Sequence, residues 1–293
     1  MKVPAQPLVS ILTPSFNQGR WLADNLRSVA AQSYAPIEHI VMDGGSTDGS
    51  IEILASASPA VTWESAPDKG QSDAINRAFA LSTGEIIGWL NSDDAYFSRE
   101  AVARAVRVFE DRPDVGVVFG HAALVNAEGT ILHVMWSPSF ARTLLRAYNL
   151  IWQPTVFVRR SAIGRDNLVD TEFDYSMDLE LLLHLRGRTR FQRVNSILAI
   201  DRHHLQRKSL TRPDLALHDR LLLARKYPMS ALGTNRVLCQ LVKIGARVAG
   251  LSKVREALHG GDALSLNAAS GRAIAIRQVA QLRRWMPSGD HEP

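Results

Sequence analysis

The stretch that most constrains the fold of this chain is a short apolar segment that ends in two adjacent carboxylates. It spans Gly84 to Asp94 and reads Gly-Glu-Ile-Ile-Gly-Trp-Leu-Asn-Ser-Asp-Asp. A continuous apolar run of this length, bounded by glycine and a polar cluster, is typical of a central strand that is covered on both faces of a parallel sheet. We therefore expect Asp93 and Asp94 to lie at the carboxyl end of a buried strand.

Two carboxylates at such an edge suit a divalent cation. Open α/β sheets bind their ligands at the carboxyl ends of the strands, and Mg²⁺ and Mn²⁺ prefer hard oxygen donors. Asp93 and Asp94 are accordingly predicted to hold Mn²⁺ or Mg²⁺ carried by a diphosphate. The alternative is that Asn91 to Asp94 only cap the helix that follows.

Apolar segments followed by polar residues and then by a helix also occur before Gly84. The pattern predicts strands at 9–13, 37–42, 61–65 and 84–90, and helices from about Trp21 to Gln32 and around Ile75 and Phe79. Strands that alternate with helices indicate right-handed crossovers. The fold class expected here is α/β, with a Rossmann-like, mostly parallel sheet flanked by helices.

After Asp94 the pattern changes, and antiparallel additions to the sheet are expected. A helix capped by Ser98 would bury Val102, Ala105, Val106 and Phe109. Asn126 to Gly129 is typical of a hairpin turn. The remaining predicted elements are strands at 115–120, 131–136 and 155–158, helices at 138–147 and 177–185, and a closing pair of strands at 190–194 and 197–201.

Composition narrows the class of protein. With 293 residues, 46% of them hydrophobic, the chain is long enough for one large domain and an appendage. Its single cysteine, Cys239, excludes an intramolecular disulfide framework and a cysteine-rich zinc site. Neither a signal peptide nor an apolar stretch of about 18 residues is found, so a cytoplasmic location is expected.

Basic residues are concentrated in the last third of the chain. Residues 202–293 hold 16 Lys and Arg against 6 Asp and Glu, whereas residues 1–201 hold 18 against 23. We predict a catalytic domain over residues 1–210 and a basic helical region over residues 211–293. Two amphipathic helices are expected there, at about 237–255 and 273–285, and they either pack on the domain or a partner, or lie on an anionic membrane. No nucleic-acid motif is present, and no nucleic-acid partner is expected.

The usual nucleotide-binding fingerprints are missing. No Gly-x-Gly-x-x-Gly follows the first predicted strand, and no Gly-x-x-x-x-Gly-Lys-Ser/Thr occurs in the chain. A dinucleotide-dependent dehydrogenase and a P-loop phosphotransferase are therefore disfavoured. A nucleotide at this sheet must be held by the polar residues at the strand ends.

Taken together, these motifs resemble family 2 glycosyltransferases of the GT-A fold over about residues 7–210. The segments that carry the resemblance are 9–17, 28–34, 43–49, 91–94, 153–154 and 175–178, with Asp68 and Gly70. The resemblance implies a nucleotide-diphosphate sugar donor, a divalent cation, and transfer of the sugar to an acceptor hydroxyl with inversion at the anomeric carbon. It also suggests a role in cell-surface polysaccharide or glycolipid synthesis, with a saccharide or lipid-linked acceptor.

The resemblance also assigns roles to individual residues. Asp178 occupies the position of the family's catalytic base, and Glu180 is the neighbouring alternative for that role. The structural alternative is that Asp178 is only a carboxylate at the N-terminus of a helix. Asp94 would hold the cation, and Asp93 would contact it or the ribose. The residues implied for the donor nucleotide and its diphosphate are Pro14, Ser15, Asn17, Asp43, Asp68, Asn76, Arg202 and His204.

Two segments depart from the family pattern. Relatives commonly have a second carboxylate after the second strand, whereas here Asp43 is followed by Gly44, which leaves the identity of the base open. Relatives also have small residues where this chain has Leu205, Gln206 and Arg207. The segment from Arg202 to Ser209 is thus either a diphosphate-binding loop or a solvated basic loop.

Two other functions share parts of this pattern. A nucleotide-sugar-binding scaffold without catalysis would need the same pocket but not Asp178. A nucleotidyltransferase would share the α/β layout, but the glycine-rich, basic N-terminal loop that binds a triphosphate is missing. No motif specifies the sugar, the linkage or the oligomeric state.

Overall fold

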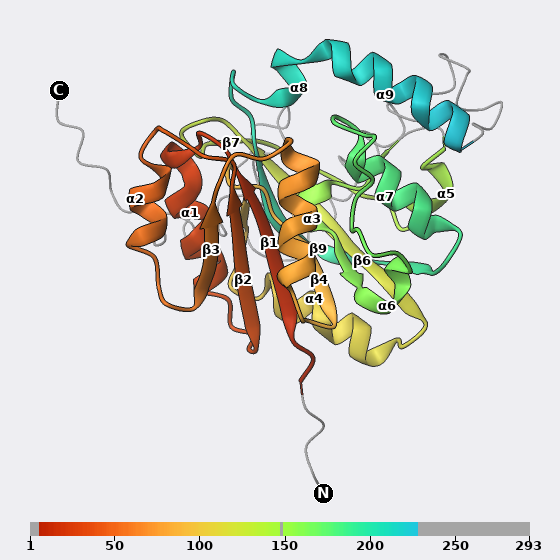
Figure 1. Cartoon of the computed structure of the whole chain (residues 1–293). Coiled ribbons are helices and arrows are strands. Elements are labelled where there is room, and N and C mark those ends of the chain that lie inside the picture. Colours follow the sequence, from red (N-terminus) through yellow and green to blue (C-terminus); the bar gives the residue numbers. More distant parts are fainter. Residues whose placement is uncertain (1–5, 147–148, 228–293) are drawn as a thin grey trace, which may run out of the picture.

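A computed structural model describes residues 6–146 and 149–227, and their secondary structure forms one large mixed sheet with helices packed against it (Figure 1). Along the sheet the strand order is β3-β2-β1-β4-β8-β6-β9-β5, and β7 pairs with β6. The strands are β1 (Val9–Ser15), β2 (Ile37–Asp43), β3 (Val61–Ser65), β4 (Ile86–Trp89), β5 (Ala95–Tyr96), β6 (Val115–Val125), β7 (Ile131–Met135), β8 (Phe157–Arg159) and β9 (Arg190–Arg202).

The first four strands are parallel, as the sequence predicts. β1 pairs with β2 on one side and β4 on the other, and the register places Ser15 beside Asp43. β3 continues the sheet with Ser65 beside Asp43. The carboxyl ends of these strands therefore meet at one edge, and all four residues of β4 are buried as a central strand requires.

Helices bury the two faces of the sheet in separate clusters. They are α1 (Gly19–Ala30), α2 (Ser50–Ala55), α3 (Gln71–Leu81), α4 (Ala101–Asp111), α5 (Ala141–Leu144), α6 (Arg160–Ile163), α7 (Met177–Arg186), α8 (Lys208–Thr211) and α9 (Pro213–Lys226). Ile87 of β4 packs with α3 and α7, whereas its neighbour Ile86 packs with α4. Adjacent residues of a strand point to opposite faces, so β4 contributes to both clusters.

The start of α4 corrects one prediction. Its predicted core residues Val102, Val106 and Phe109 are fully buried. Ser98, however, is not its cap: the helix begins after Glu100, without a side-chain cap, and Ser98 accepts the Ala101 N–H through its backbone carbonyl. The apolar stripe was enough to find the helix, but a serine within a turn of its start does not fix the first residue.

The antiparallel additions are present. β8 is antiparallel to both β4 and β6, and β6 and β7 form the predicted hairpin. In its turn the Thr130 N–H donates to Asn126 Oδ1, and Gly129 adopts a φ of 82°. Two lengths differ from the predictions: α5 covers only four residues, and a 3₁₀ turn over Gln153–Thr155 precedes β8.

The prediction of two closing strands is wrong, because residues 190–202 form one continuous strand, β9. Its parallel partner β6 is nearly as long, and the pairing contains register shifts between Phe119 and Ala122. At these shifts the strand accommodates the polar Asn195 without a turn. The side chain of Asn195 is paired there, since its Oδ1 lies 3.2 Å from His121 Nε2. The polar pair Asn195-Ser196 therefore marks an irregularity within one strand, such as a β-bulge, and not a chain reversal.

α9 lies beyond the predicted boundary at residue 210 and still packs on the sheet domain. Leu223 belongs to the same buried cluster as α3 and α7, and Leu222 and Tyr227 pack against it. α8 and α9 lie over the carboxyl end of the sheet (Figure 1). The two amphipathic helices predicted after residue 236 fall outside the described residues, as does Cys239.

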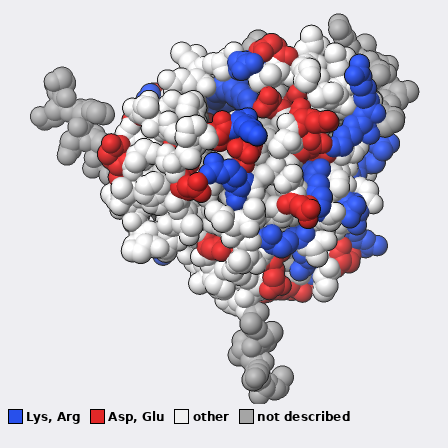
Figure 2. All heavy atoms as spheres, in the orientation of Figure 1, with Lys and Arg blue, Asp and Glu red and all other residues white. Residues whose placement is uncertain are grey.

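Charge is unevenly spread over the face shown in Figure 2. Lys and Arg gather along its right-hand side, acidic and basic groups alternate in its upper part, and its left side is mostly uncharged. Within residues 6–146 and 149–227, no helix is long and apolar enough to cross a membrane.

Gly84, at the entrance to β4, should tolerate no side chain. A Cβ there would lie 2.4 Å from Ser10 Oγ and 2.8 Å from the carbonyl oxygen of Leu8, which is backbone and cannot move aside. Gly84→Ala should lower the free energy of unfolding by about 1–3 kcal/mol, the usual cost of overpacking. The matched control is Gly187→Ala, since nothing lies within 4 Å of a Cβ at Gly187. Urea titration of both variants measures the difference, and equal unfolding midpoints would contradict this packing.

Candidate active site

A cavity of about 860 Å³ opens at the carboxyl edge of the parallel strands. Its size is in the range of pockets that enclose a small organic ligand. The loops after β1, β2, β3 and β4 line it, together with the 3₁₀ turn, the start of α7 and the segment around α8. The charged residues in its lining are Asp68, Asp93, Asp94, Asp178, Asp201, Arg207 and Lys208.

Asp93 and Asp94 follow β4 into this cavity, as predicted. Asp94 is 5% exposed, and its Oδ1 accepts the backbone N–H of Arg202 at 3.0 Å. Asp93 Oδ2 lies 2.9 Å from Nε2 of His204. Burial, and then repulsion from Asp93 and Asp201, raises the pKa of Asp94 well above its usual range. This corner of the cavity would therefore favour any added positive charge.

Asp201 is a third carboxylate at this corner, and the sequence-based site missed it. It lies at the end of β9, and burial raises its pKa although Arg207 lies 2.7 Å from its Oδ1 and opposes that rise. Its position at the end of an apolar strand is the same signal that identified Asp93 and Asp94. In the sequence, however, Asp201 stands only as the last residue of a predicted strand.

The carboxylate oxygens of Asp93 and Asp94 fit a divalent cation whose other ligands come from a bound diphosphate. Among the described residues, no group of three His, Cys, Asp or Glu side chains is close enough to hold a metal alone. Asp93 and Asp94 nevertheless supply hard oxygen donors beside an open cavity, and their mutual repulsion favours a cation. Diphosphate oxygens could complete such a coordination shell.

Arg202 and His204 lie behind the carboxylates and do not line the cavity. Arg202 is 2% exposed, and its Nε donates to the Asp93 carbonyl oxygen at 2.9 Å. Its Nη2 lies 3.2 Å from Asp24 Oδ2 on α1. The His204 ring packs on Trp21 with centroids 4.0 Å apart. Both residues hold the acidic loop in place through these contacts, and their role at the donor diphosphate stays a prediction.

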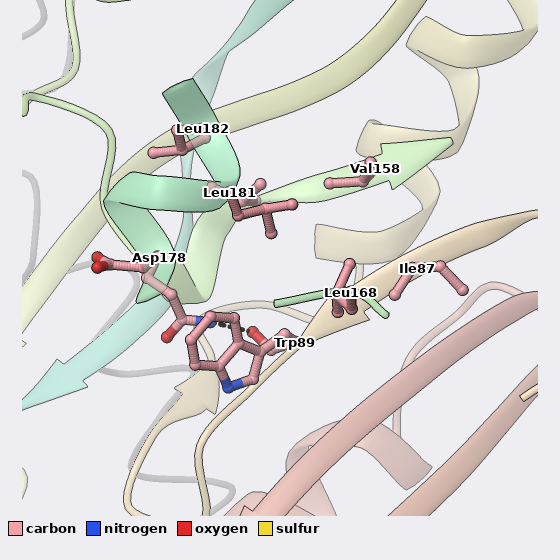
Figure 3. Close-up of a pocket in the computed structure, with 9 residues that line it drawn as sticks. Ile87, Trp89, Val158, Leu168, Asp178, Leu181 and Leu182 are labelled. Carbon is pink, nitrogen blue, oxygen red and sulfur yellow. Dashed lines mark hydrogen bonds between the residues drawn. The ribbon is translucent and has the colours of Figure 1, made fainter. Parts of the chain in front are cut away.

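Asp178, the second residue of α7, also lines the cavity and is half-buried. It also borders a small apolar pocket of about 20 Å³ lined by Ile87, Val158 and Leu181 among others (Figure 3). Figure 3 shows its carboxylate at the edge of this apolar group and turned away from it. Burial raises the pKa of Asp178 to about 6, and thus outweighs the helix N–H groups that lower it.

Glu180, the alternative to Asp178 as the catalytic base, is buried and bonded to neighbouring side chains. Its side chain is fully buried and pairs with Arg165 at 2.8 Å and with Lys226 Nζ at 2.9 Å. Tyr227 also donates its hydroxyl to Glu180 Oε1 at 2.7 Å. These partners hold the pKa of Glu180 below its usual value, although its burial opposes this. Glu180 does not line the cavity, whereas Asp178 does.

The residues predicted around the nucleotide divide into two groups. Pro14, Ser15 and Asp68 line the cavity. Asn17, Asp43 and Asn76 do not, because backbone groups occupy their side chains. Asn17 Oδ1 accepts the Thr47 N–H at 2.9 Å. Asp43 Oδ2 accepts the N–H of Gly45 and of Ser46. Asn76 bonds both the N–H and the carbonyl oxygen of Val169.

Gly44 makes room for the carboxylate of Asp68. A Cβ at Gly44 would lie 2.9 Å from Asp68 Oδ2 and 3.2 Å from a ring carbon of Phe16. The other carboxylate oxygen, Oδ1, accepts the Gly70 N–H at 2.8 Å, which fixes the side chain. The space beside Gly44 is thus occupied by a carboxylate from the third loop, next to a Phe16 ring that is 60% exposed.

Comparison with known proteins agrees with this arrangement. The family model for glycosyl transferase family 2 matches residues 10–169. The chain belongs to glycosyl transferase family 2. An uncharacterised glycosyltransferase of Mycobacterium tuberculosis is 31% identical over 184 residues, which cover 60% of this chain and 68% of that protein. The chondroitin synthase of Pasteurella multocida is 27% identical over 195 residues, which cover 65% of this chain and 20% of that synthase.

Solved structures confirm the GT-A fold of this glycosyltransferase. TarS of Staphylococcus aureus in complex with UDP-GlcNAc superposes with a TM-score of 0.60 at 15% identity, covering 77% of this chain and 68% of that one. The mannosyltransferase PcManGT of Pyrobaculum calidifontis, with GDP-Man and Mn²⁺, gives 0.59 at 19% identity and covers 96% and 85%.

Asn76 provides a test of the division between cavity and support. Asn76→Ala removes both bonds to Val169 and should lower the free energy of unfolding by about 1–3 kcal/mol, because buried backbone groups lose their partners. Nucleotide affinity of the folded protein should not change. Urea unfolding and calorimetric titration with UDP and GDP measure the two effects. Weaker nucleotide binding without loss of stability would instead show that Asn76 contacts the nucleotide.

Proposed function

We propose that this family 2 glycosyltransferase is an inverting enzyme that transfers a sugar from a nucleotide-diphosphate donor to an acceptor hydroxyl. One observation carries the proposal: Asp178, whose pKa lies near 6, shares a single cavity with Asp93 and Asp94. A base and a site for a leaving diphosphate are the two parts that such a displacement needs.

Asp178 acts on the acceptor. Its carboxylate accepts the proton of the acceptor hydroxyl as that oxygen forms its bond to the anomeric carbon. The bond between the anomeric carbon and the diphosphate oxygen breaks with its electron pair, and a nucleoside diphosphate leaves. Attack from the side opposite the leaving group inverts the anomeric centre. A half-buried carboxylate with a raised pKa is a stronger base than one in water.

The acidic corner receives the leaving group. Asp93 and Asp94 would hold Mn²⁺ or Mg²⁺, which neutralises charge on the diphosphate when it is bound. Arg207 lines the same cavity and pairs with Asp201, so its guanidinium can turn to a diphosphate oxygen. The Mn²⁺ in the PcManGT structure supports this role for a cation. Arg202 holds the backbone that carries both carboxylates.

The nucleobase would bind between Phe16, Gly44 and Asp68. An aromatic ring exposed at a cavity can stack on a base, and a carboxylate oxygen accepts a ring N–H. Uracil and guanine each carry such a donor. The UDP-GlcNAc of TarS and the GDP-Man of PcManGT support donors of either kind.

The acceptor we infer is a saccharide or a lipid-linked saccharide of the cell surface. Relatives named chondroitin synthase and PGL/p-HBAD biosynthesis glycosyltransferase support this class. A non-catalytic nucleotide-sugar scaffold is the second candidate, and the activity of the unmodified chain separates the two.

Diphosphate binding tests the acidic corner. Calorimetric titration with UDP, GDP and dTDP should give binding of one or two of them that strengthens with Mn²⁺. Asp94→Ala should weaken the Mn²⁺-dependent part at least about tenfold, since a charged ligand to the cation is lost. Asp111→Ala, at the exposed last residue of α4, should bind as the unmodified chain does. Absence of binding for all three diphosphates, with and without Mn²⁺, would refute the donor site.

Asp178→Asn tests the base. The variant should lose about 10²- to 10⁴-fold in kcat while it keeps its affinity for the diphosphate. Because the base must be deprotonated, activity of the unmodified chain should fall as pH drops below about 6, and a bound cation would move that limb lower. Release of diphosphate from UDP-GlcNAc and GDP-mannose measures both effects. Glu172→Gln is the control, at an exposed position in the segment before α7.

A further inference from the structure

The first turn of α7 is held by a side chain from another helix. The first N–H groups of a helix have no partner within it, and Ser176 at the N-cap makes no side-chain cap here. Instead Asp219, in the middle of α9, accepts the N–H of Tyr175 and the N–H of Ser176 on its Oδ2, each at 2.7 Å. Asp219 is fully buried. A carboxylate at this position also complements the helix dipole.

A second contact from α9 lies one turn further along α7. Lys226 Nζ and the Tyr227 hydroxyl bond Glu180, at 2.9 Å and 2.7 Å. On the opposite side, Ser72 of α3 donates to the Phe173 carbonyl oxygen at 2.8 Å. α9 therefore holds α7 both before and after Asp178, and Asp219 makes the contact at the turn from which Asp178 enters the cavity.

We propose that Asp219 is a positioning residue for catalysis, because its buried carboxylate fixes the turn that presents Asp178 to the acceptor. The inference rests on the proposed function insofar as Asp178 is the base. Asp219 itself does not line the cavity, so it acts through the backbone of Tyr175 and Ser176.

Asp219 also contributes charge to the surroundings of Asp178. After burial, the carboxylates of Asp201 on β9 and Asp219 on α9 raise the pKa of Asp178. The basic groups near Asp219 are Lys208 on α8 and His218 on α9, whose Nδ1 lies 3.4 Å from Asp219 Oδ1. An asparagine at 219 would keep an oxygen for the two N–H groups but remove the negative charge. It should therefore lower the pKa of Asp178, whereas alanine should remove the anchor as well.

The test compares Asp219→Ala and Asp219→Asn with the unmodified full chain. Diphosphate release from UDP-GlcNAc and GDP-mannose in Mn²⁺ gives kcat and KM across pH 5–8, and calorimetry gives the affinity for UDP and GDP. Carbon NMR of the aspartate carboxyl groups, with Asp178 assigned from Asp178→Asn, follows the titration of Asp178 directly. Circular dichroism verifies that each variant is folded at the assay temperature.

Asp219→Ala should lower kcat about 10- to 100-fold with unchanged diphosphate affinity, as expected for a misplaced catalytic group. Asp219→Asn should retain more of the rate and move the acid limb, and the titration of Asp178, to lower pH. Asp214→Asn, exposed on the same helix and paired with Arg212, should change neither.

A merely structural Asp219 would lower the unfolding temperature of both variants and leave kcat, the pH profile and the Asp178 titration unchanged, and this result would overturn the inference. If Asp219→Ala does not fold, Asp219→Asn and the NMR titration decide. Full turnover in Asp178→Asn would overturn the proposed function instead, and the effect of Asp219 on the Asp178 carboxyl would still be measurable.

Discussion

Repulsion among buried carboxylates is the constraint on which the rest of the site depends. Asp93 and Asp94 follow β4, Asp201 lies near the end of β9, and all three line one cavity, where burial weakens the screening of Asp94 by solvent. The fold keeps them together through Arg202, whose backbone and guanidinium bond the loop that carries the first two. Such an arrangement is unfavourable by itself and becomes favourable when positive charge or a charged ligand enters.

At the start of α7, the environment of Asp178 differs from that of the acidic corner. Asp178 borders an apolar pocket, and burial is the main cause of its raised pKa, with smaller contributions from Asp201 and Asp219. The acids of one cavity are thereby separated by environment: a repelling cluster suited to a cation, and a single desolvated carboxylate suited to a proton. That separation follows from which strand or helix carries each residue.

The sequence predicted the parallel half of the fold well, because buried strands there are continuous apolar runs with polar ends. It also identified Asp93, Asp94, Asp178 and Asp68 as residues that turn out to line one cavity. Motif spacing does not show which partner a side chain bonds. The side chains of Asp43 and Asn76 bond backbone groups, and their residue types do not indicate this. β9 was divided in two because a polar pair inside a strand resembles a turn. The role of α9 was missed since its contacts join segments more than forty residues apart.

Gly44 and Asp68 form one unit that is divided between two loops. The space left by the absent side chain at Gly44 is filled by the carboxylate of Asp68, so a larger residue at 44 would have to displace that carboxylate. The residue at position 44 alone therefore does not show which side chain occupies this part of the cavity. Substitutions at Gly44 and Asp68 should therefore be non-additive, because the two positions share the same space.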